Sequence, residues 1–179
     1  MKICVYCASS AEIDKVYLQA AAHLGQLLAK NNITCLNGAG NQGLMGALND
    51  SILRHGGKAH GIIPQFMVDN DWCHSRLSET TVTNTMHERK ALMAREADAI
   101  IALPGGFGTL EELAEIITWR QLGLYKNPII IVNINNYYDP LLAFFDKMIS
   151  EKFMPAAYNN TWQVAENVEE AIKFLILNS

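Results

Sequence analysis

Short, uninterrupted apolar runs alternate along the chain with longer segments in which apolar residues recur at helical spacing. The runs 99–103 and 129–133 are apolar throughout, which is typical of parallel strands covered on both faces. The pattern predicts strands near 2–7, 33–37, 58–63, 98–103, 128–134 and 161–164, and helices near 12–30, 43–55, 86–97, 109–123, 138–150 and 167–177. This alternation predicts an α/β fold: a doubly wound, Rossmann-like, mainly parallel sheet with helices on both faces.

The segment 64–85 interrupts this regularity. It carries residues such as Asp69, Trp72 and His74 without a clear period, so we expect a loop that lies over a binding site. The rest of the chain shows no internal repeat, low-complexity tract or linker. With 179 residues, half of them hydrophobic, one sizeable core can be buried. We expect a single domain over residues 1–179.

The charge of the chain limits its partners. The formal net charge is -4, and acidic and basic residues are interspersed. This mixture argues against a broad nucleic-acid or membrane surface, whereas a small anionic substrate in a local pocket stays compatible with it. No apolar run reaches the length of a membrane span, and the N-terminal run is too short for a signal peptide.

Four cysteines stand at positions 4, 7, 35 and 73, and the first two form a C-x-x-C motif. That motif serves redox or metal chemistry in some proteins. Here it falls in a predicted strand, where residues three apart point to opposite faces, and no second ligand pair follows. We therefore expect buried free thiols, no metal site and a reducing, cytoplasmic location.

The loop after the strand 98–103 is the first candidate site. Gly105, Gly106 and Gly108 allow the backbone to approach a ligand closely, and Thr109 is expected to open a helix whose free amides favour an anion such as phosphate. A second interpretation needs no ligand. Thr109 and Glu112 match a capping box, in which each side chain satisfies a backbone donor of the other residue. The spacing alone leaves both interpretations open.

Arg89 is the second candidate. It lies three residues after Met86 and four before Met93, within an apolar stripe of the predicted helix 86–97. A guanidinium in that position either extends its charge to solvent or meets an anion.

The third candidate is the loop after the second strand, where Gly38, Gly40 and Gly43 satisfy G-x-G-x-x-G. The dinucleotide fingerprint normally follows the first strand and requires an acidic residue about 20 positions later, which is missing here. Close packing of this loop against a substrate, or only a tight turn, is therefore favoured over NAD binding. Ser9, after the first strand, is expected either to cap a helix or to contact phosphate.

Two of these motifs together resemble the paired signature of the LOG (Lonely Guy) family: MHERK at 86–90 and PGGFGTLEE at 104–112. Supporting similarities are CVYCASS at 4–10, GLMG at 43–46, GIIP at 61–64, ITWRQLG at 117–123 and NYY at 136–138. Family members release the free base from cytokinin riboside 5′-monophosphates, and many bacterial members act on AMP.

The resemblance implies that Arg89 and Glu112 are the catalytic pair. It also implies an acidic substrate contact eighteen positions before the arginine, where this chain has Asp71 in place of the usual Glu. With the glycine loops included, the expected substrate-binding residues are Ser9, Gly40, Asp71, Arg89, Lys90, Gly105, Gly106, Phe107, Gly108, Thr109, Leu110, Glu111, Glu112 and Thr118.

The implied reaction is hydrolysis of the N-glycosidic bond of a purine nucleoside 5′-monophosphate, with no cofactor and no metal. The Glu112 carboxylate would activate water and stabilise an oxocarbenium-like transition state. Family members are homodimers with sites at or near the subunit interface, so the resemblance implies a dimer. The alternatives are a non-catalytic nucleotide or molybdenum-cofactor carrier of the same fold and, less favoured, an NAD-dependent oxidoreductase.

Overall fold

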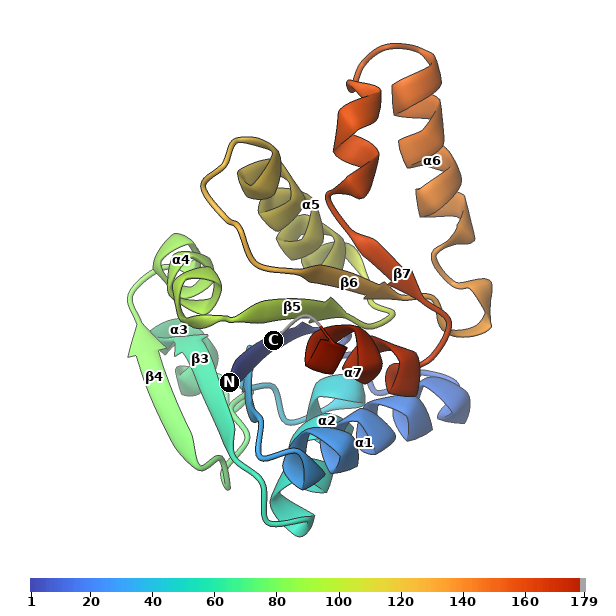
Figure 1. Ribbon diagram of the computed structural model, residues 1–179. Coiled ribbons are helices and arrows are strands. Elements are labelled where there is room, and N and C mark those ends of the chain that lie inside the picture. The colour runs from blue at the N-terminus through green and yellow to red at the C-terminus, as the bar shows by residue number, and fades with distance from the viewer. Residues whose placement is uncertain (178–179) are drawn as a thin grey trace.

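The protein is represented by a computed structural model (Figure 1), and the structure describes residues 1–177. Seven strands form one sheet in the order β4-β3-β2-β1-β5-β6-β7, and every neighbouring pair is parallel. The strands are β1 (Lys2–Tyr6), β2 (Thr34–Asn37), β3 (Ala59–Pro64), β4 (Glu79–Thr83), β5 (Ala99–Ala102), β6 (Ile129–Val132) and β7 (Gln163–Ala165). The α-helices are α1 (Lys15–Lys30), α2 (Gly43–Arg54), α3 (Gln65–Asp69), α4 (Met86–Glu96), α5 (Phe107–Gln121), α6 (Asp139–Ser150) and α7 (Val168–Leu177), with short 3-10 turns at Ile134–Asn136 and Ala156–Asn160.

Helices cover both faces of the sheet (Figure 1). One face packs against α1, α2 and α7, and the other packs against α4, α5 and α6. Strand β1 shows why, because Ile3 and Val5 join the first core while Cys4 and Tyr6 join the second. The α/β, doubly wound prediction is confirmed, and the sheet is parallel throughout.

The segment 64–85 is more regular than predicted. It contains α3 and the strand β4, so the expectation of an unbroken loop was wrong. Strand β4 has the sequence ETTVT and lies at the edge of the sheet with most of its side chains exposed. An edge strand needs no apolar face, so the hydrophobic pattern did not reveal it.

The sheet order creates a switch point. Strand β1 pairs with β2 on one side and with β5 on the other, and the chain runs outward from β1 in both directions. In sheets of this kind ligands bind at the carboxyl ends of the strands, beside such a reversal. Both candidate loops from the sequence, the one after β2 and the one after β5, leave the sheet at this edge.

Three of the cysteines, Cys4, Cys7 and Cys35, are buried free thiols, and Cys73 is a partly buried one. Burial raises the pKa of the Cys4 and Cys7 thiols well above its ordinary value. Cys4 and Cys7 belong to different cores, as their spacing predicted. Within residues 1–177, no three His, Cys, Asp or Glu side chains gather as metal ligands would, and no helix has the length and hydropathy needed to cross a membrane.

Candidate active site

A cavity of about 560 Å³ opens at the carboxyl edge of the sheet. Its walls come from the segments after β1, β2, β3 and β5 and from the starts of α4 and α5. The cavity therefore lies at the switch point between β1 and β5. Segments that are far apart in the sequence meet there because parallel strands bring all their carboxyl ends to one edge.

A buried ion pair forms one wall of this cavity. The Nη1 of Arg89, on α4, donates to Oε1 of Glu112, on α5, over 2.8 Å. The two residues are only 6% and 8% exposed, and the Nε of Arg89 donates to the Ile62 carbonyl at 3.0 Å. Gly38 makes room for this arrangement, because a Cβ at that position would collide with the guanidinium. Arg89 thus meets an anion and does not extend to solvent.

Burial perturbs the acid of this pair. Removal of the Glu112 carboxyl from water raises its pKa above the ordinary value of 4.5, although the charge and hydrogen bond of Arg89 act in the opposite direction. A carboxyl group with a raised pKa, placed in a cavity beside a fixed cation, suits proton transfer near neutral pH.

The N-terminus of α5 forms a second wall. The helix begins at Phe107, two residues earlier than predicted, with Gly106 as its N-cap and no side chain bonded to the cap position. Thr109 therefore lies inside the first turn, and the predicted capping box with Glu112 does not exist. The amides of Phe107, Gly108 and Thr109 are left at the positive end of a 15-residue helix, and all three residues line the cavity.

Two tyrosines fix the loop before this helix. Tyr137 donates its hydroxyl to the Gly105 carbonyl at 2.8 Å, and Tyr138 donates to the Leu103 carbonyl at 2.7 Å. Gly105 itself lies against Thr109, where a Cβ would collide with the threonine side chain. The loop is held from outside the cavity, so its amides are oriented before any ligand arrives.

A capping box does occur at the start of α4, where the sequence analysis did not identify one. The Thr85 hydroxyl accepts from the Glu88 amide at 3.1 Å, and the Glu88 carboxylate accepts from the amides of Asn84 and Thr85. This box begins the helix at Met86 and thereby sets the turn on which Arg89 lies.

Most of the substrate-binding residues predicted from the sequence line the cavity: Ser9, Gly40, Arg89, Gly106, Phe107, Gly108, Thr109, Glu111 and Glu112. Five do not, namely Asp71, Lys90, Gly105, Leu110 and Thr118. Lys90 is buried and makes ion pairs with Glu111 and Glu115, while Thr118 donates its hydroxyl to the Ala114 carbonyl.

Asp71 lies beside the cavity without lining it. Its φ of 58° is left-handed, and its carbonyl accepts from the Asn41 side chain at 2.9 Å. Its side chain is exposed. In this structure Asp71 therefore supports the cavity wall only indirectly, through the hydrogen bond from the Asn41 side chain to its carbonyl.

The apolar part of the cavity lining was not predicted from the sequence. Met45, Ile63, Met67, Trp72 and Met86 line the cavity, together with the polar residues Ser10, Asn41 and Gln42. Most of these residues lie at or after the carboxyl ends of β1, β2 and β3 or near the start of a helix, and this position was the only signal for them in the sequence. Their residue types gave no signal, because single methionines are usual in any core.

Packing explains the glycines of the G-x-G-x-x-G match. Gly38 faces Arg89, and Gly43 has a φ of +61° and lies so close to Ser10 that a Cβ would collide with its carbonyl. These contacts bring the loops after β1 and β2 together. Packing within the protein therefore accounts for Gly38 and Gly43, and close packing of this loop against a substrate stays a prediction.

The fold and this cavity define a Rossmann-like α/β protein with an uncapped helix N-terminus at its switch point. Residues 45–175 match the family described as "Possible lysine decarboxylase". A probable cytokinin riboside 5′-monophosphate phosphoribohydrolase of Oryza sativa subsp. japonica is 45% identical over 155 residues, which is 87% of this chain and 70% of that protein. A cytokinin riboside 5′-monophosphate phosphoribohydrolase of Arabidopsis thaliana is 41% identical over 175 residues, which is 97% of this chain and 80% of that protein. The chain belongs to this LOG family.

Solved structures agree on the fold. The molybdenum cofactor carrier protein of Chlamydomonas reinhardtii superimposes with a TM-score of 0.75 over 98% of this chain and 96% of that one, at 20% identity. A molybdenum cofactor binding protein of Rippkaea orientalis gives a TM-score of 0.73 over 99% and 96%, at 22% identity. At such identities the likeness shows a shared fold and nothing about cargo.

Proposed function

We propose that this protein hydrolyses the N-glycosidic bond of purine nucleoside 5′-monophosphates, giving the free base and ribose 5-phosphate. The buried Arg89–Glu112 pair beside the uncapped N-terminus of α5 is the observation that carries this proposal. An anion-binding helix end and a carboxyl group with a raised pKa, about one and a half turns apart on one helix, suit a substrate with a phosphate next to a reactive sugar. The names of the relatives from rice and Arabidopsis support the same reaction.

In this proposal the 5′-phosphate accepts hydrogen bonds from the amides of Phe107, Gly108 and Thr109, and the ribose lies over the Arg89–Glu112 pair. Ionised Glu112 accepts a proton from water as the water oxygen bonds to C1′. The C1′–N9 bond breaks, its electron pair leaves with the base, and the base takes up a proton from solvent, while Glu112 returns its proton to solvent. Glu112 also stabilises the positive charge that develops on the ribose ring. Arg89 holds the carboxylate in position.

The direct test is incubation with AMP and with isopentenyladenosine monophosphate, followed by chromatographic detection of the released base. A LOG-family enzyme of known activity serves as the positive control. We expect base from at least one of the two monophosphates. If the control releases base and this protein releases none from either, the hydrolase proposal fails.

A substitution in the phosphate loop should separate binding from chemistry. A Cβ at Gly106 meets nothing within 4 Å, so Gly106→Ala should fold normally. The new methyl group lies in the cavity beside the α5 amides and should weaken one charge-assisted hydrogen bond to phosphate, which raises KM by about 10- to 100-fold. Steady-state kinetics would show KM rising more than kcat falls. A fall in kcat of that size, with KM unchanged, would contradict a phosphate site at this loop.

The pH profile should report Glu112. The proposed reaction needs its ionised form, which is lost as the pH falls through its pKa. Because burial raises that pKa, the acid limb of kcat/KM should lie above pH 4.5 and not at it. The measurement is kcat/KM against pH, with the melting temperature followed over the same range. An activity that stays constant down to pH 4.5, with the protein still folded, would argue against Glu112 as the base.

We also propose a homodimer with its sites at or near the subunit interface. Phe107, at the edge of the cavity, is 90% exposed, and Leu122 and Leu124 are exposed beyond the other end of α5. Apolar side chains this exposed support a partner surface. Light scattering should give twice 19.9 kDa, and Leu124→Glu should shift the mass towards one chain. A monomeric wild-type protein at micromolar concentration would contradict this proposal.

The cellular setting and the domain boundaries belong to the same proposal. The free thiols, three of them buried, support a cytoplasmic location. We propose that residues 1–179 act as one domain. Its last two residues lie outside the part that the structure describes.

A further inference from the structure

Residues 71–76, which we call the strap, carry Trp72 in the cavity wall and are fixed to the loop after β2. The His74 amide donates to the Ala39 carbonyl at 2.8 Å, and the Asn41 amide donates to the Trp72 carbonyl at 3.1 Å. Gly40 and Cys73 form an antiparallel bridge between these two bonds. The strap is therefore a short extra strand on the loop that follows β2.

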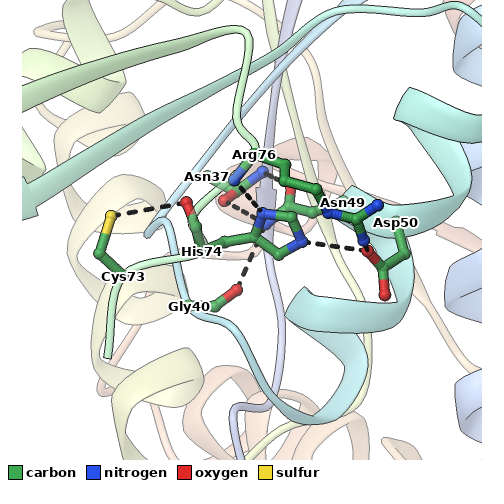
Figure 2. A network of polar contacts seen from close by, with 7 residues as sticks. All are labelled: Asn37, Gly40, Asn49, Asp50, Cys73, His74 and Arg76. Atoms are coloured by element: carbon green, nitrogen blue, oxygen red, sulfur yellow. Dashed lines mark hydrogen bonds and ion pairs between the residues drawn. The ribbon is translucent and has the colours of Figure 1, made fainter. Parts of the chain in front are cut away.

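The side chain of His74 anchors the strap (Figure 2). It is 7% exposed, and its Nδ1 lies 3.2 Å from the Arg76 amide, which can only donate. Nδ1 must therefore be unprotonated, so the proton is on Nε2, which donates to Asp50 on α2 at 3.1 Å. The guanidinium of Arg76 binds the same carboxylate oxygen. The His74 imidazole thus bonds both to the Arg76 amide, at the other end of a tight turn, and to Asp50 on α2.

A buried amide pair holds the loop to which the strap is bonded (Figure 2). The Asn37 side chain accepts from the Ala39 amide at 2.8 Å and donates to Asn49 at 2.7 Å, and Asn49 donates to the Gly40 carbonyl at 3.3 Å. Ala39 has a left-handed φ of 63°, which a residue with a Cβ adopts only when its surroundings enforce it. Side-chain hydrogen bonds therefore fix both the strap and the loop after β2 to which the strap is bonded.

The strap presents Trp72 to the cavity. Trp72 lines the cavity, is 52% exposed, and shares the cavity lining with the apolar side chains of Met45, Ile63 and Met67. Adjacent strands are about 4.8 Å apart, so the ends of β2 and β3 lie about 10 and 14 Å from the end of β5. With phosphate at the loop after β5 and ribose at the Arg89–Glu112 pair, the base of a nucleotide extends towards the ends of β2 and β3, and the segments that follow these strands carry Met45, Met67 and Trp72.

We propose that Trp72 packs against the purine base and is a determinant of which base the enzyme accepts, and that His74 is the positioning residue that holds Trp72 there. This inference rests on the proposed function. Indole faces stack on any purine, and thioether and hydrocarbon side chains beside it provide an apolar surface for substituents on the ring. No residue of the phosphate loop takes part in this contact.

The experiment compares Trp72→Ala, Trp72→Phe and the control Phe66→Ala. Phe66 is a half-exposed aromatic residue on α3 that does not line the cavity. Each variant is assayed for kcat/KM on AMP and on isopentenyladenosine monophosphate, and for inhibition by ribose 5-phosphate, which occupies only the phosphate and ribose positions.

For Trp72→Ala we expect kcat/KM to fall about 5- to 100-fold on at least one monophosphate. Inhibition by ribose 5-phosphate should stay within twofold, Trp72→Phe should recover most of the loss, and Phe66→Ala should match wild type. If kcat/KM changes less than this on both substrates, or ribose 5-phosphate inhibition weakens in parallel, the inference is overturned. A wild-type protein that releases no base at all would instead overturn the proposed function.

His74 is tested by the same readouts. His74→Gln keeps a donor for Asp50, whereas His74→Ala removes it. His74→Ala should reproduce the Trp72→Ala pattern, and His74→Gln should recover part of kcat/KM. The double variant Trp72→Ala/His74→Ala should lose no more than twofold beyond Trp72→Ala, because a positioning residue has nothing left to position. Independent, multiplying losses would overturn the positioning role.

Discussion

Replacing Glu112 by glutamine is expected to lower kcat by about 10²- to 10⁴-fold, which is the usual contribution of a general base. Glutamine has the same shape and can still accept the 2.8 Å hydrogen bond from Arg89, but it cannot take a proton from water. Two effects on stability oppose each other: the ion pair is lost, and so is the cost of burying a carboxylate. We therefore expect a melting temperature close to that of wild type.

The matched control is Glu115→Gln. Glu115 lies on the same helix three residues later, pairs with Lys90, and does not line the cavity. Its replacement should leave kcat within about twofold. If Glu112→Gln instead keeps wild-type turnover and loses stability, the carboxylate has only a structural role.

Replacing Arg89 by methionine is expected to cost about 3–5 kcal/mol of unfolding free energy, since it leaves the buried Glu112 carboxylate without a partner. Arg89 lowers the pKa of Glu112, so its removal should raise that pKa further. A carboxyl group whose folded pKa lies above its unfolded value loses stability as the pH rises through the folded pKa. The variant should therefore be closest to wild-type stability at low pH and furthest from it at pH 8, and its turnover at pH 7 should be negligible.

Urea unfolding at several pH values measures this effect, with Arg89→Lys as the comparison. Lysine keeps the charge but has no planar guanidinium with which to donate to both Ile62 and Glu112, so intermediate stability is expected. An Arg89→Met protein with wild-type stability at pH 8 would show that the two residues are not coupled.

The hydrophobic pattern was sufficient to predict the α/β architecture but not the strand at the edge of the sheet. The central strands β5 and β6 are apolar throughout because helices cover both faces, and that pattern was readable directly. Strand β4 was not, since Val82 is exposed and the other residues of this edge strand, which pairs only with β3, are Glu79 and three threonines. The start of α5 was predicted two residues too late, because the sequence offered a second possible helix start. Thr109 and Glu112 match a capping box in sequence, but the helix already begins at Phe107, after Gly106 as the N-cap.

For the site, spacing could suggest candidates but could not choose between their roles. Nothing in the sequence distance between Arg89 and Glu112 indicates that they meet, because the contact is made by two different helices across the sheet edge. The resemblance to the LOG family suggested the pair, and the structure supplied the contact. Lys90, the next residue, came from the same resemblance but lies outside the cavity, bound to Glu111 and Glu115. The tryptophan on the strap had no motif to reveal it.

The most direct test of hydrolysis at the Arg89–Glu112 pair is a product balance in phosphate-free buffer. Purified protein is incubated with the monophosphate that it prefers, and free base and ribose 5-phosphate are quantified together for wild type and Glu112→Gln. The account predicts equal amounts of the two products from wild type, no stimulation by added inorganic phosphate, and almost none of either product from the variant. Base release that requires phosphate and yields a ribose bisphosphate, or release that is undiminished in Glu112→Gln, would contradict it.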